Sequence, residues 1–528
     1  MATNTYSIVE YYYDSAPKRH SCGYCKKLRS YERHEEETEI ILGMWAHYLT
    51  VQDYQNLIDR GWRRSGCYCY KPVNTQTCCP MYTIKCDALD FVVSKSQKKV
   101  IKRMAKFLKD GERKVQENES GRNHKPYSGQ LSEIDVDDLP ETELAEYAAR
   151  AQKNIFQDEP MLVTATCEKR LSQCPENVTE SKIKRGSHDK RDSVQVQPMV
   201  DDNQSNQPQI VKLVPAPEGQ PRKKKLMRIE RAKNRLLAQG KTLAEIEDFY
   251  RRKKKPSRAR PIEELLPNLE GGQNKLELKL VRVSSEEFME TLDESVELFK
   301  KYQKAVHHDK PEDRDKASFI NFLGKSPLIH WKVAGGPPLG YGSFHQQYRL
   351  NDKLIAVGVI DILPYCVSSV YLFYDPEYSF LSLGTFSSLI EVRLVRELHA
   401  LVPDLKYYYM GYYIHEIPKM RYKAKVRPSF LLCPETYTWH PIEKCTPKLD
   451  KDKYSRLNED INALDADCVI SEDDINQVRV YYRGPRLYGE VRNTRLMCSG
   501  KDDMKEVKEY AELVGRKCAH NMCLFRSC

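Results

Sequence analysis

The sequence lacks any long apolar run, since no stretch approaches the roughly 18 consecutive apolar residues of a membrane-spanning helix. The N-terminal residues MATNTYSIVE lack the apolar core of a signal peptide. The C-terminal residues CLFRSC have no cysteine fourth from the end, so a prenylation box is missing. We therefore expect a soluble cytoplasmic protein with no membrane partner. In that compartment the 17 cysteines should be reduced thiols or metal ligands and not disulfides.

Positive charge is concentrated in one part of the chain. The net charge is +10, yet residues 222–260 hold sixteen basic and four acidic residues, a local net of +12, which leaves −2 for the rest. Such a block favours a polyanion such as RNA, and its basic runs could equally be a nuclear signal or a solvated tail. We predict a basic helix within 222–260, inside a polar segment of residues 111–270 that is otherwise largely disordered.

The first 110 residues are rich in cysteine and contain two pairs that could share one metal site. Cys22 and Cys25 form a C-x-x-C pair on a glycine turn, and Cys78 and Cys79 are adjacent. Four thiolates suit tetrahedral zinc or an iron–sulfur cluster. The spacing leaves the ligand set open, because several of these could be buried structural thiols. Further cysteines nearby are Cys67, Cys69 and Cys86.

The hydrophobic period changes most clearly between residues 340 and 434. The pattern predicts two buried strands, a helix and a third strand, at 353–363, 368–374, 386–401 and 407–409 respectively. Four charged residues of that helix are predicted to face water, namely Glu391, Arg393, Arg396 and Glu397. Upstream, the pattern predicts a strand at 275–283 and a helix at 284–306. Downstream, it predicts helices at 454–464 and 503–514 and a hairpin at 478–491.

Asp361 ends the first of these strands and shares a face with Ile355, Val357 and Val359. A carboxylate at the end of an apolar face is partly desolvated, which raises its affinity for a proton. Asp361 is therefore a candidate for accepting a proton or for orienting an amine. A structural salt bridge or a turn hydrogen bond would explain the same position.

Cations alternate with other residues between positions 419 and 427. If this stretch is extended, all of its cations project from one face, which favours phosphate or carboxylate recognition. A solvated edge strand protected by lysine would have the same pattern. The cations are Lys419, Arg421, Lys423, Lys425 and Arg427.

Two resemblances follow from these residues. Two strands and a long helix on a mixed sheet resemble the GNAT class of acyltransferases, but the turn LSLG at Leu381 has a single glycine, so the usual grip on coenzyme A is missing. A longer set of motifs lies at both ends of the chain, namely CGYC from Cys22, GWRRSG from Gly61, CCP from Cys78, YGSFHQQY from Tyr341, VGVIDILP from Val357, SSVYLFYD from Ser368, LSLG from Leu381 and PKMRYK from Pro418. Over residues 1–95 and 275–445 this set resembles eukaryotic arginyl-tRNA–protein transferases.

The resemblance implies transfer of arginine from arginyl-tRNA to the α-amine of proteins that begin with Asp, Glu or oxidised Cys, creating a signal for ubiquitin-dependent degradation. It also implies zinc or an iron–sulfur cluster on Cys22, Cys25, Cys78 and Cys79, and no coenzyme A. The expected catalytic residues are Asp361, His345, Gln346 and Gln347. The expected substrate-binding cations are Arg63, Arg64, Lys419, Arg421 and Lys423. The expected tRNA contacts are Lys425, Arg427, Lys223, Lys224 and Lys225.

The resulting fold class is α+β, with a small Cys-rich N-terminal α+β domain at 1–110, the linker at 111–270, a GNAT-like catalytic domain at 271–450 and a C-terminal extension at 451–528. Two other functions remain open. A coenzyme A-dependent N-acetyltransferase would need the missing pyrophosphate loop. A non-catalytic RNA-binding adaptor would account for the basic block and the cysteines but would leave Asp361 without a role.

Overall fold

The computed structural model describes residues 6–13, 20–22, 24–25, 38–111, 224–242, 245–246, 260–266, 269, 271–307, 315–468, 471–499 and 502–526. Contacts divide the chain into two compact units, Met1–Glu159 with Ala259–Cys528, and Pro160–Arg258. Most of the predicted linker lies outside the described residues. In the second unit, helix α4 (Lys224–Ala238) falls within the predicted basic segment. Among the described helices, none has the length and apolar character needed to cross a membrane.

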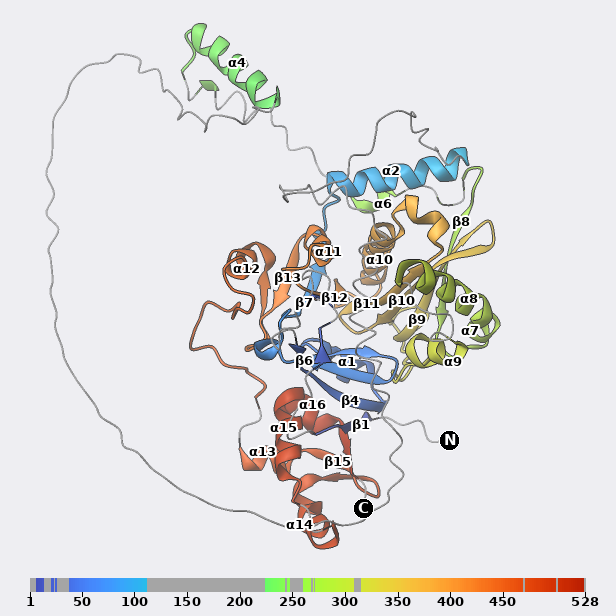
Figure 1. The fold of residues 1–528 in the computed structure, drawn as a ribbon, viewed down its shortest axis with the longest axis vertical. Helices are drawn as coiled ribbons and strands as arrows, with labels where there is room; N and C mark the ends of the chain where they lie inside the picture. Colours follow the sequence, from blue (N-terminus) through green and yellow to red (C-terminus); the bar gives the residue numbers. More distant parts are fainter. Residues whose placement is uncertain are drawn as a thin grey trace, which may run out of the picture. The chain divides into compact units, whose positions relative to one another are not determined.

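The first unit is built on an eight-stranded mixed sheet in the order β14-β13-β7-β12-β11-β10-β9-β8 (Figure 1). Its β11–β12 pair is parallel, and a parallel pair needs a crossover, which helix α10 (Leu383–His399) supplies. The predicted strands and helix are therefore confirmed in type. The strands are β7 (Tyr82–Asp87), β8 (Leu276–Arg282), β9 (Gly342–Leu350), β10 (Lys353–Ile362), β11 (Cys366–Tyr374), β12 (Tyr407–Tyr413), β13 (Ser429–Leu432) and β14 (Trp439–Pro441).

Strands β11 and β12 separate after a short paired stretch. They pair only from Cys366 to Ser368 on β11 and from Tyr407 to Tyr409 on β12. Beyond that point β11 continues along β10, and β12 continues along β7. Among the described strands of this main sheet, β11 and β12 form the one parallel pair, and the sheet is split between them.

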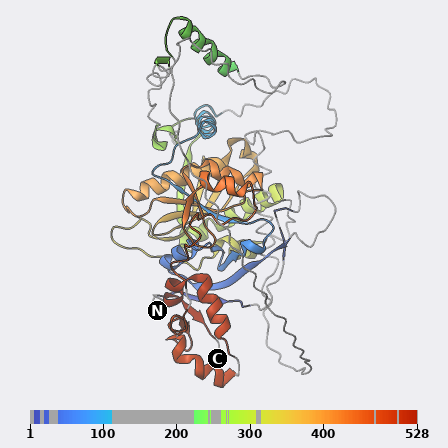
Figure 2. The ribbon, with the colours of Figure 1, turned by 90° about the vertical axis from the view of Figure 1, so that its left-hand side faces the viewer.

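Strand β7 comes from the N-terminal segment, yet it lies between β12 and β13. A second sheet, in the order β16-β15-β17-β1-β4-β6-β5, combines strands from both ends of the chain (Figure 2). Segments from three of the predicted domains therefore share one compact unit. The strands are β1 (Ile8–Tyr11), β4 (Ile41–Tyr48), β5 (Arg63–Ser65), β6 (Tyr68–Pro72), β15 (Arg479–Tyr481), β16 (Pro485–Leu487) and β17 (Cys523–Phe525); β2 (His20–Ser21) pairs with β3 (Thr38–Glu39).

Alternate residues of β9 show which helices cover each face of the main sheet. The ring of His345 packs against Phe288 of α7 (Glu286–Glu290) and Phe319 of α9 (Lys316–Phe319). The next residue, Gln346, lies beside Gly358, at a position that faces Glu391 of α10. Helix α8 (Leu292–Tyr302) lies on the His345 face. Helix α2 (Lys95–Asp110) covers the start of α10.

Helix α2 is capped at both ends. Ser94 and Gln97 form a capping box, and Gly111 closes the helix with a φ of 69°, a conformation that glycine adopts at little cost.

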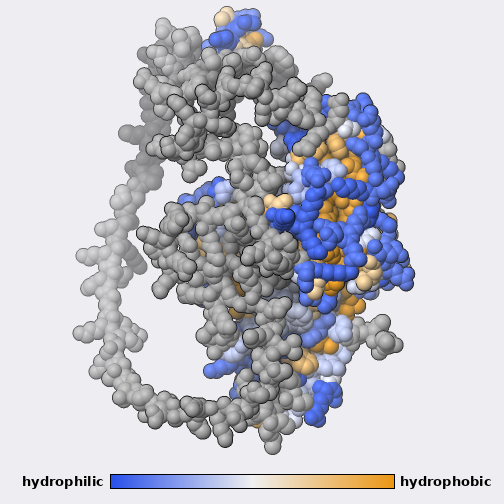
Figure 3. Space-filling view, turned by 45° about the vertical axis from the view of Figure 1, so that its right-hand side comes forward, coloured by the Kyte–Doolittle hydropathy of each residue, from blue (hydrophilic) through white to orange (hydrophobic). Residues whose placement is uncertain are grey.

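The space-filling view shows mainly hydrophilic side chains on the described part of one face, with apolar side chains between them (Figure 3).

The C-terminal region agrees only in part with its prediction. The expected helix near 503–514 is present as α15 (Met504–Val514). The hairpin is shorter than predicted, because α14 (Tyr488–Ser499) follows β16 directly. The prediction of a helix at 454–464 is wrong, since these residues form turns and irregular chain. The other helices here are α12 (Ile442–Leu449), α13 (Glu472–Asn476) and α16 (Arg516–Asn521).

Candidate functional site

Four thiols converge where the N-terminal segment meets the main sheet. The sulfur atoms of Cys22, Cys25, Cys78 and Cys79 all lie within 4.8 Å of one another, and the Cys25 and Cys78 sulfurs are 3.5 Å apart. A tetrahedral ion with metal–sulfur bonds of about 2.3 Å holds its ligands at comparable separations. The four residues therefore fit a metal ion or a small cluster, and no other such group occurs in the described part of the chain.

The thiol cluster, meaning these four cysteines, is held by packing on both of its sides. It lies in an apolar cluster with Tyr70 of β6 and with Tyr412, Ile414 and Ile417 at the end of β12. Hydrogen bonding with Cys22 raises the pKa values of Cys78 and Cys79. Mutual shifts of this kind are expected where several thiols lie at the spacing of ligands to one cation.

The other N-terminal cysteines stay outside the thiol cluster. Cys69 is fully buried on β6, and burial raises its pKa to about 12. Burial also raises the pKa values of Cys67 and Cys86. These three have the raised pKa values of buried structural thiols, and among the described residues only the four cysteines of the thiol cluster lie close enough together to share a metal ion.

Asp361 forms a buried ion pair with Arg64 of β5. Arg64 Nε and Nη2 donate to the two carboxylate oxygens at 2.9 and 2.5 Å, and the two side chains are 2% and 0% exposed. Burial acts to lower the pKa of Arg64, but the Asp361 charge outweighs it, so that pKa is raised. This is the salt bridge that the sequence left as an alternative.

Two serines complete the surroundings of this pair. Ser343 Oγ on β9 donates to the Asp361 carboxylate at 2.6 Å and accepts from Arg64 Nη2 at 3.0 Å. The Ser326 and Ser343 hydroxyl oxygens lie 2.6 Å apart. Both carboxylate oxygens are therefore engaged, which favours a role in positioning Arg64 over direct acceptance of a proton.

The three β9 candidates do not form one constellation. His345 is fully buried, its Nε2 lies 3.0 Å from the Leu323 carbonyl oxygen, and burial lowers its pKa to about 4. Gln347 donates to Thr291 at 2.8 Å on the same face of the sheet. Gln346 lies on the opposite face and accepts from the Tyr348 hydroxyl at 2.9 Å. Successive strand residues alternate between faces, so adjacent positions could not all serve one substrate.

Glu391 of α10 is a buried carboxylate, so the prediction that it faces water is wrong. It is 1% exposed, and its Oε2 has no hydrogen-bond partner among the described residues. Burial raises its pKa to about 7, although Tyr408 and Ser369 partly offset this. Those two residues lie where β11 and β12 begin to separate. The feature of the sequence that accompanies this burial is a glycine within the buried strand β10. A Cβ atom at Gly358 would lie 3.3 Å from the Glu391 carboxylate, so the glycine leaves room for it.

The titration of Glu391 should appear in the pH dependence of stability. The unfolded chain loses this proton near the ordinary pKa of 4.5, whereas the folded protein keeps it to about pH 7. The free energy of unfolding should therefore fall as pH rises between these values. Relative to the Glu391→Gln variant, which has no such proton, the wild type should lose up to about 3 kcal/mol between pH 5 and 8, measured by urea unfolding.

Glu397→Gln, a change on an exposed residue of the same helix, is the control and should show no comparable change with pH. If the two variants give the same pH dependence, Glu391 does not keep its proton in the folded protein as we expect.

The cation run is helical, so the prediction of an extended strand with all its cations on one face is wrong. Residues Pro418–Arg421 form helix α11, and Tyr422–Lys425 form the 3₁₀ helix η7. Proline is favoured in the first turn of a helix. The cations point in different directions because they bind different partners. Arg421 Nε donates to the His415 carbonyl oxygen, and Arg427 pairs with Glu443 at 3.4 Å.

Arg63 and Lys423 do meet, at the end of β12. Lys423 Nζ donates to the Tyr412 carbonyl oxygen at 2.6 Å, and Arg63 Nη2 to that of Gly411 at 3.5 Å. Burial, followed by the Arg63 charge, lowers the pKa of Lys423 to about 7. Because neighbouring strand residues face opposite ways, Arg63 reaches β12 while Arg64 reaches Asp361 on β10.

The other predicted cations are less informative. Lys425 is half-buried in η7. The side chains of Lys419, Lys224 and Lys225 and the whole of Lys223 lie outside the described residues.

Comparisons with known proteins agree on one family. Residues 20–99 match the family model "Arginine-tRNA-protein transferase, N terminus", and residues 294–433 match the corresponding C-terminal model. The chain is 40% identical to arginyl-tRNA–protein transferase 1 of Drosophila melanogaster over 98% of this chain and 99% of that one. It is 36% identical to arginyl-tRNA–protein transferase 2 of Arabidopsis thaliana, covering 84% and 77% of the two chains. An aspartate/glutamate leucyltransferase of Campylobacter jejuni is 33% identical over 26% of this chain and 51% of its own.

Proposed function

The chain belongs to the arginyl-tRNA–protein transferase family and transfers arginine from arginyl-tRNA to proteins, and we propose that its acceptors begin with Asp, Glu or oxidised Cys. The arginine would attach to the α-amine and mark the acceptor for ubiquitin-dependent degradation. The likeness to a bacterial enzyme named for aspartate and glutamate supports acidic acceptors. We also propose a cytoplasmic and nuclear location, supported by the basic runs near residues 222–225 and 251–255.

One observation carries the proposal of an acidic acceptor. Arg63 and Lys423 converge beside Tyr412, and their hydrogen bonds within the described chain go to carbonyl oxygens and not to carboxylates. Arg63 is a buried cation without an acidic partner in the described part of the chain. A bound anion would raise the lowered pKa of Lys423 and favour its charged form, so the two residues together favour an anion. The side chain of an N-terminal Asp or Glu supplies that anion, with Arg421 as a further contact.

The reaction requires little from the enzyme beyond positioning the acceptor amine next to the tRNA ester. The tRNA ester is already activated, and correct placement of two reactants can lower a barrier by roughly 7 to 11 kcal/mol. An α-amine with a pKa of about 8 is partly neutral at pH 7 and can attack the ester carbonyl. The new amide bond replaces the ester bond, and one proton of the amine goes to the ribose oxygen of the departing tRNA.

We infer a GNAT-like catalytic module that takes the aminoacyl end where β11 and β12 separate. Diverging strands leave backbone groups that can pair with an extended ligand. In this arrangement Arg64 and Asp361 fix β5 against β10. Arg427 and the basic block contact the tRNA backbone, so tRNA binding should weaken as salt rises.

An enzyme of the same fold class can instead transfer an acetyl group from acetyl-coenzyme A. The donor molecule therefore distinguishes that function from our proposal. Purified protein supplied with arginyl-tRNA should modify a peptide that begins with Asp but not one that begins with Ala. Transfer from acetyl-coenzyme A without tRNA, with no arginine transfer, would overturn the assignment.

Lys423→Met tests the acidic-acceptor site. A hydrogen bond to a charged group contributes about 1.5 to 3 kcal/mol, so the preference of kcat/KM for Asp over Asn acceptors should fall by about tenfold or more. Lys444→Met, which changes an exposed lysine of α12, should leave the preference as it is. An undiminished preference in Lys423→Met, with normal tRNA binding, would move acid recognition elsewhere.

A further inference from the structure

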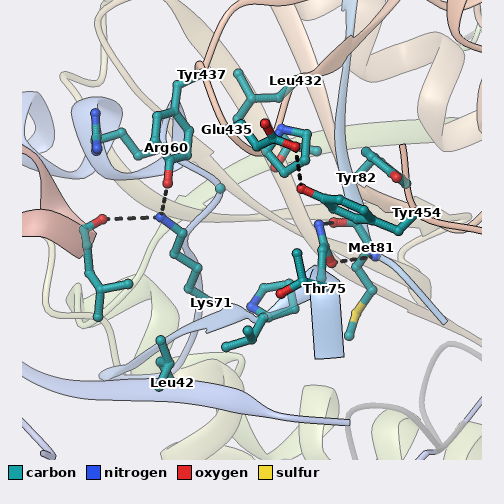
Figure 4. Close-up of a pocket in the computed structure, with 17 residues that line it drawn as sticks. Leu42, Arg60, Lys71, Thr75, Met81, Tyr82, Leu432, Glu435, Tyr437 and Tyr454 are labelled. Carbon is teal, nitrogen blue, oxygen red and sulfur yellow. Dashed lines mark hydrogen bonds between the residues drawn. The ribbon is translucent and has the colours of Figure 1, made fainter. Parts of the chain in front are cut away.

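A second cationic site lies apart from the contacts assigned above. A cavity of about 270 Å³ is enclosed by the end of β6, the start of β7 and the chain after β13 (Figure 4). Exposed Thr75 and Glu435 are among its lining residues, so it opens to solvent. Leu42, Val73, Met81 and Leu432 form apolar parts of its wall.

Lys71 is the unusual group in this cavity. Its Nζ donates to the Tyr437 hydroxyl at 2.8 Å and to the Leu513 carbonyl oxygen at 3.2 Å (Figure 4). An ammonium group has three donors, so one is left. Among the described residues no carboxylate lies within salt-bridge distance of it. Burial, followed by the Arg60 charge, lowers its pKa well below the ordinary value.

The other charges around the cavity already have partners. Arg60 stacks on the same Tyr437 ring, but its two terminal nitrogens donate to Asp465 at 3.0 and 2.5 Å. Glu435 is bound by Arg456 at 2.7 Å. Lys71 is therefore the group still available to an incoming anion, whose negative charge would raise the lowered pKa of Lys71 and favour its charged form.

A buried hydroxyl adds a second polar group without a partner. Thr83 lines the cavity at 3% exposure, and its Oγ1 has no hydrogen-bond partner among the described residues. Buried polar groups in folded proteins nearly always have a partner. An occupant with an oxygen acceptor would satisfy both Lys71 and Thr83.

We propose that this cavity binds a carboxylate on a short apolar stem. One available ammonium matches the single charge of a carboxylate, whereas a phosphate dianion would bring a second charge toward Glu435. The apolar wall suits a stem of two or three carbons, and the volume holds a small acid or one residue of a peptide. The carboxylate can come from a free small acid or from the side chain of an acidic peptide.

The cavity shares a loop with the thiol cluster. Asn74, which lines the cavity, donates to the carbonyl oxygen of Met81 and accepts from its backbone nitrogen at 3.0 and 2.9 Å. Cys78 and Cys79 lie within the loop that these two bonds close. An occupant that contacts this loop would therefore act on the same segment that carries two of the four thiols.

Calorimetric titration of the full-length protein tests the proposal with three probes, the tripeptide amides Asp-Ala-Ala and Asn-Ala-Ala and the free acid propionate. The Asp peptide should bind at least about tenfold more tightly than the Asn peptide, because loss of one charged hydrogen bond costs about 1.5 kcal/mol or more. The wild type should bind two Asp peptides, one here and one beside Arg63 and Lys423, and Lys71→Met should lower that stoichiometry to one. Competition by propionate identifies a free acid as a sufficient ligand, and its failure to compete identifies the peptide.

Lys448→Met is the matched control, because Lys448 also donates to a backbone carbonyl, that of Leu457 at 3.0 Å, but does not line the cavity. It should leave binding unchanged. Thr83→Val is a second, smaller change that should weaken the Asp peptide if Lys71→Met fails to fold. Equal binding of the Asp peptide to wild type, Lys71→Met and Thr83→Val overturns the proposal, as does the absence of binding by either carboxylate. Lys423→Met should lose only the other binding event, so failure of this proposal is distinguishable from failure of the acceptor site assigned to Arg63 and Lys423.

Discussion

Arg64→Met should destabilise the protein by about 3 to 5 kcal/mol, the usual cost of breaking a buried ion pair by removing one partner. The change leaves the Asp361 carboxylate at 0% exposure with, among the residues that the structure describes, only the Ser343 hydroxyl to donate to it. A buried charge that loses its counterion is expensive because the protein interior solvates it poorly. The free energy of unfolding in urea measures the effect.

The double variant Arg64→Met, Asp361→Leu should recover much of that loss, because replacing both partners with apolar groups of similar size is often nearly neutral. The control is Arg393→Met, which breaks the Arg393–Glu397 pair on α10 at 29% and 52% exposure. An exposed pair of this kind contributes less than about 1 kcal/mol. If Arg64→Met costs no more than Arg393→Met, the pair does not hold β5 against β10.

Asp361→Asn separates the structural role of the pair from its role in transfer. The amide keeps one acceptor for Arg64 but removes the charge, so the rate of transfer should fall while tRNA binding stays close to that of the wild type. A parallel fall in tRNA binding would mean that Asp361 supports the tRNA site and not the reaction.

The position of Asp361 at the end of a buried strand could be predicted from a period of two, but its partner could not. Arg64 lies 297 residues earlier, and sequence periodicity carries no information about such distant contacts. The same holds for β7, whose insertion between β12 and β13 joins the N-terminal segment to the main sheet.

Two errors show where local patterns mislead. Alternation of cations from Lys419 to Arg427 imitates a strand, but Pro418 starts a helix and the β12 carbonyl oxygens bind Lys423 and Arg63. Glu391 was assigned to the water-facing side of α10 because charged residues surround it. Its burial depends on the space left by Gly358 across the sheet, which a helical periodicity cannot register.

The proximity of the four cysteines was easier to predict than the burial of Glu391. The residues within each pair are close in sequence, so a single long-range contact brings the two pairs together. Spacing identified the pairs, and the structure adds that Cys67, Cys69 and Cys86 stay apart from them. The thiol cluster is thus the proposed set of metal ligands, and substitution of one of its cysteines tests that proposal.

Cys79→Ser should remove most of the bound metal, because this buried thiol lies within 4.8 Å of its three partners and a serine hydroxyl is a poor substitute for a thiolate. Elemental analysis after anaerobic and aerobic purification measures the content and distinguishes zinc from iron. Cys86→Ser, at a buried thiol outside the cluster, is the control and should keep the full content. A double Cys22→Ser, Cys25→Ser variant with wild-type metal content would remove both residues from the ligand set.

Loss of the metal should also loosen the segments that the thiol cluster ties together. A ligand that binds only the folded state, present at 1,000 times its dissociation constant, stabilises that state by about 4 kcal/mol. A chelator should therefore lower the thermal midpoint of the wild type and of Cys86→Ser but not that of Cys79→Ser. Because Tyr412 packs against both the thiols and Arg63, the same treatment should weaken selection of acidic acceptors before it weakens tRNA binding. The reverse order would place the thiol cluster with the tRNA contacts instead.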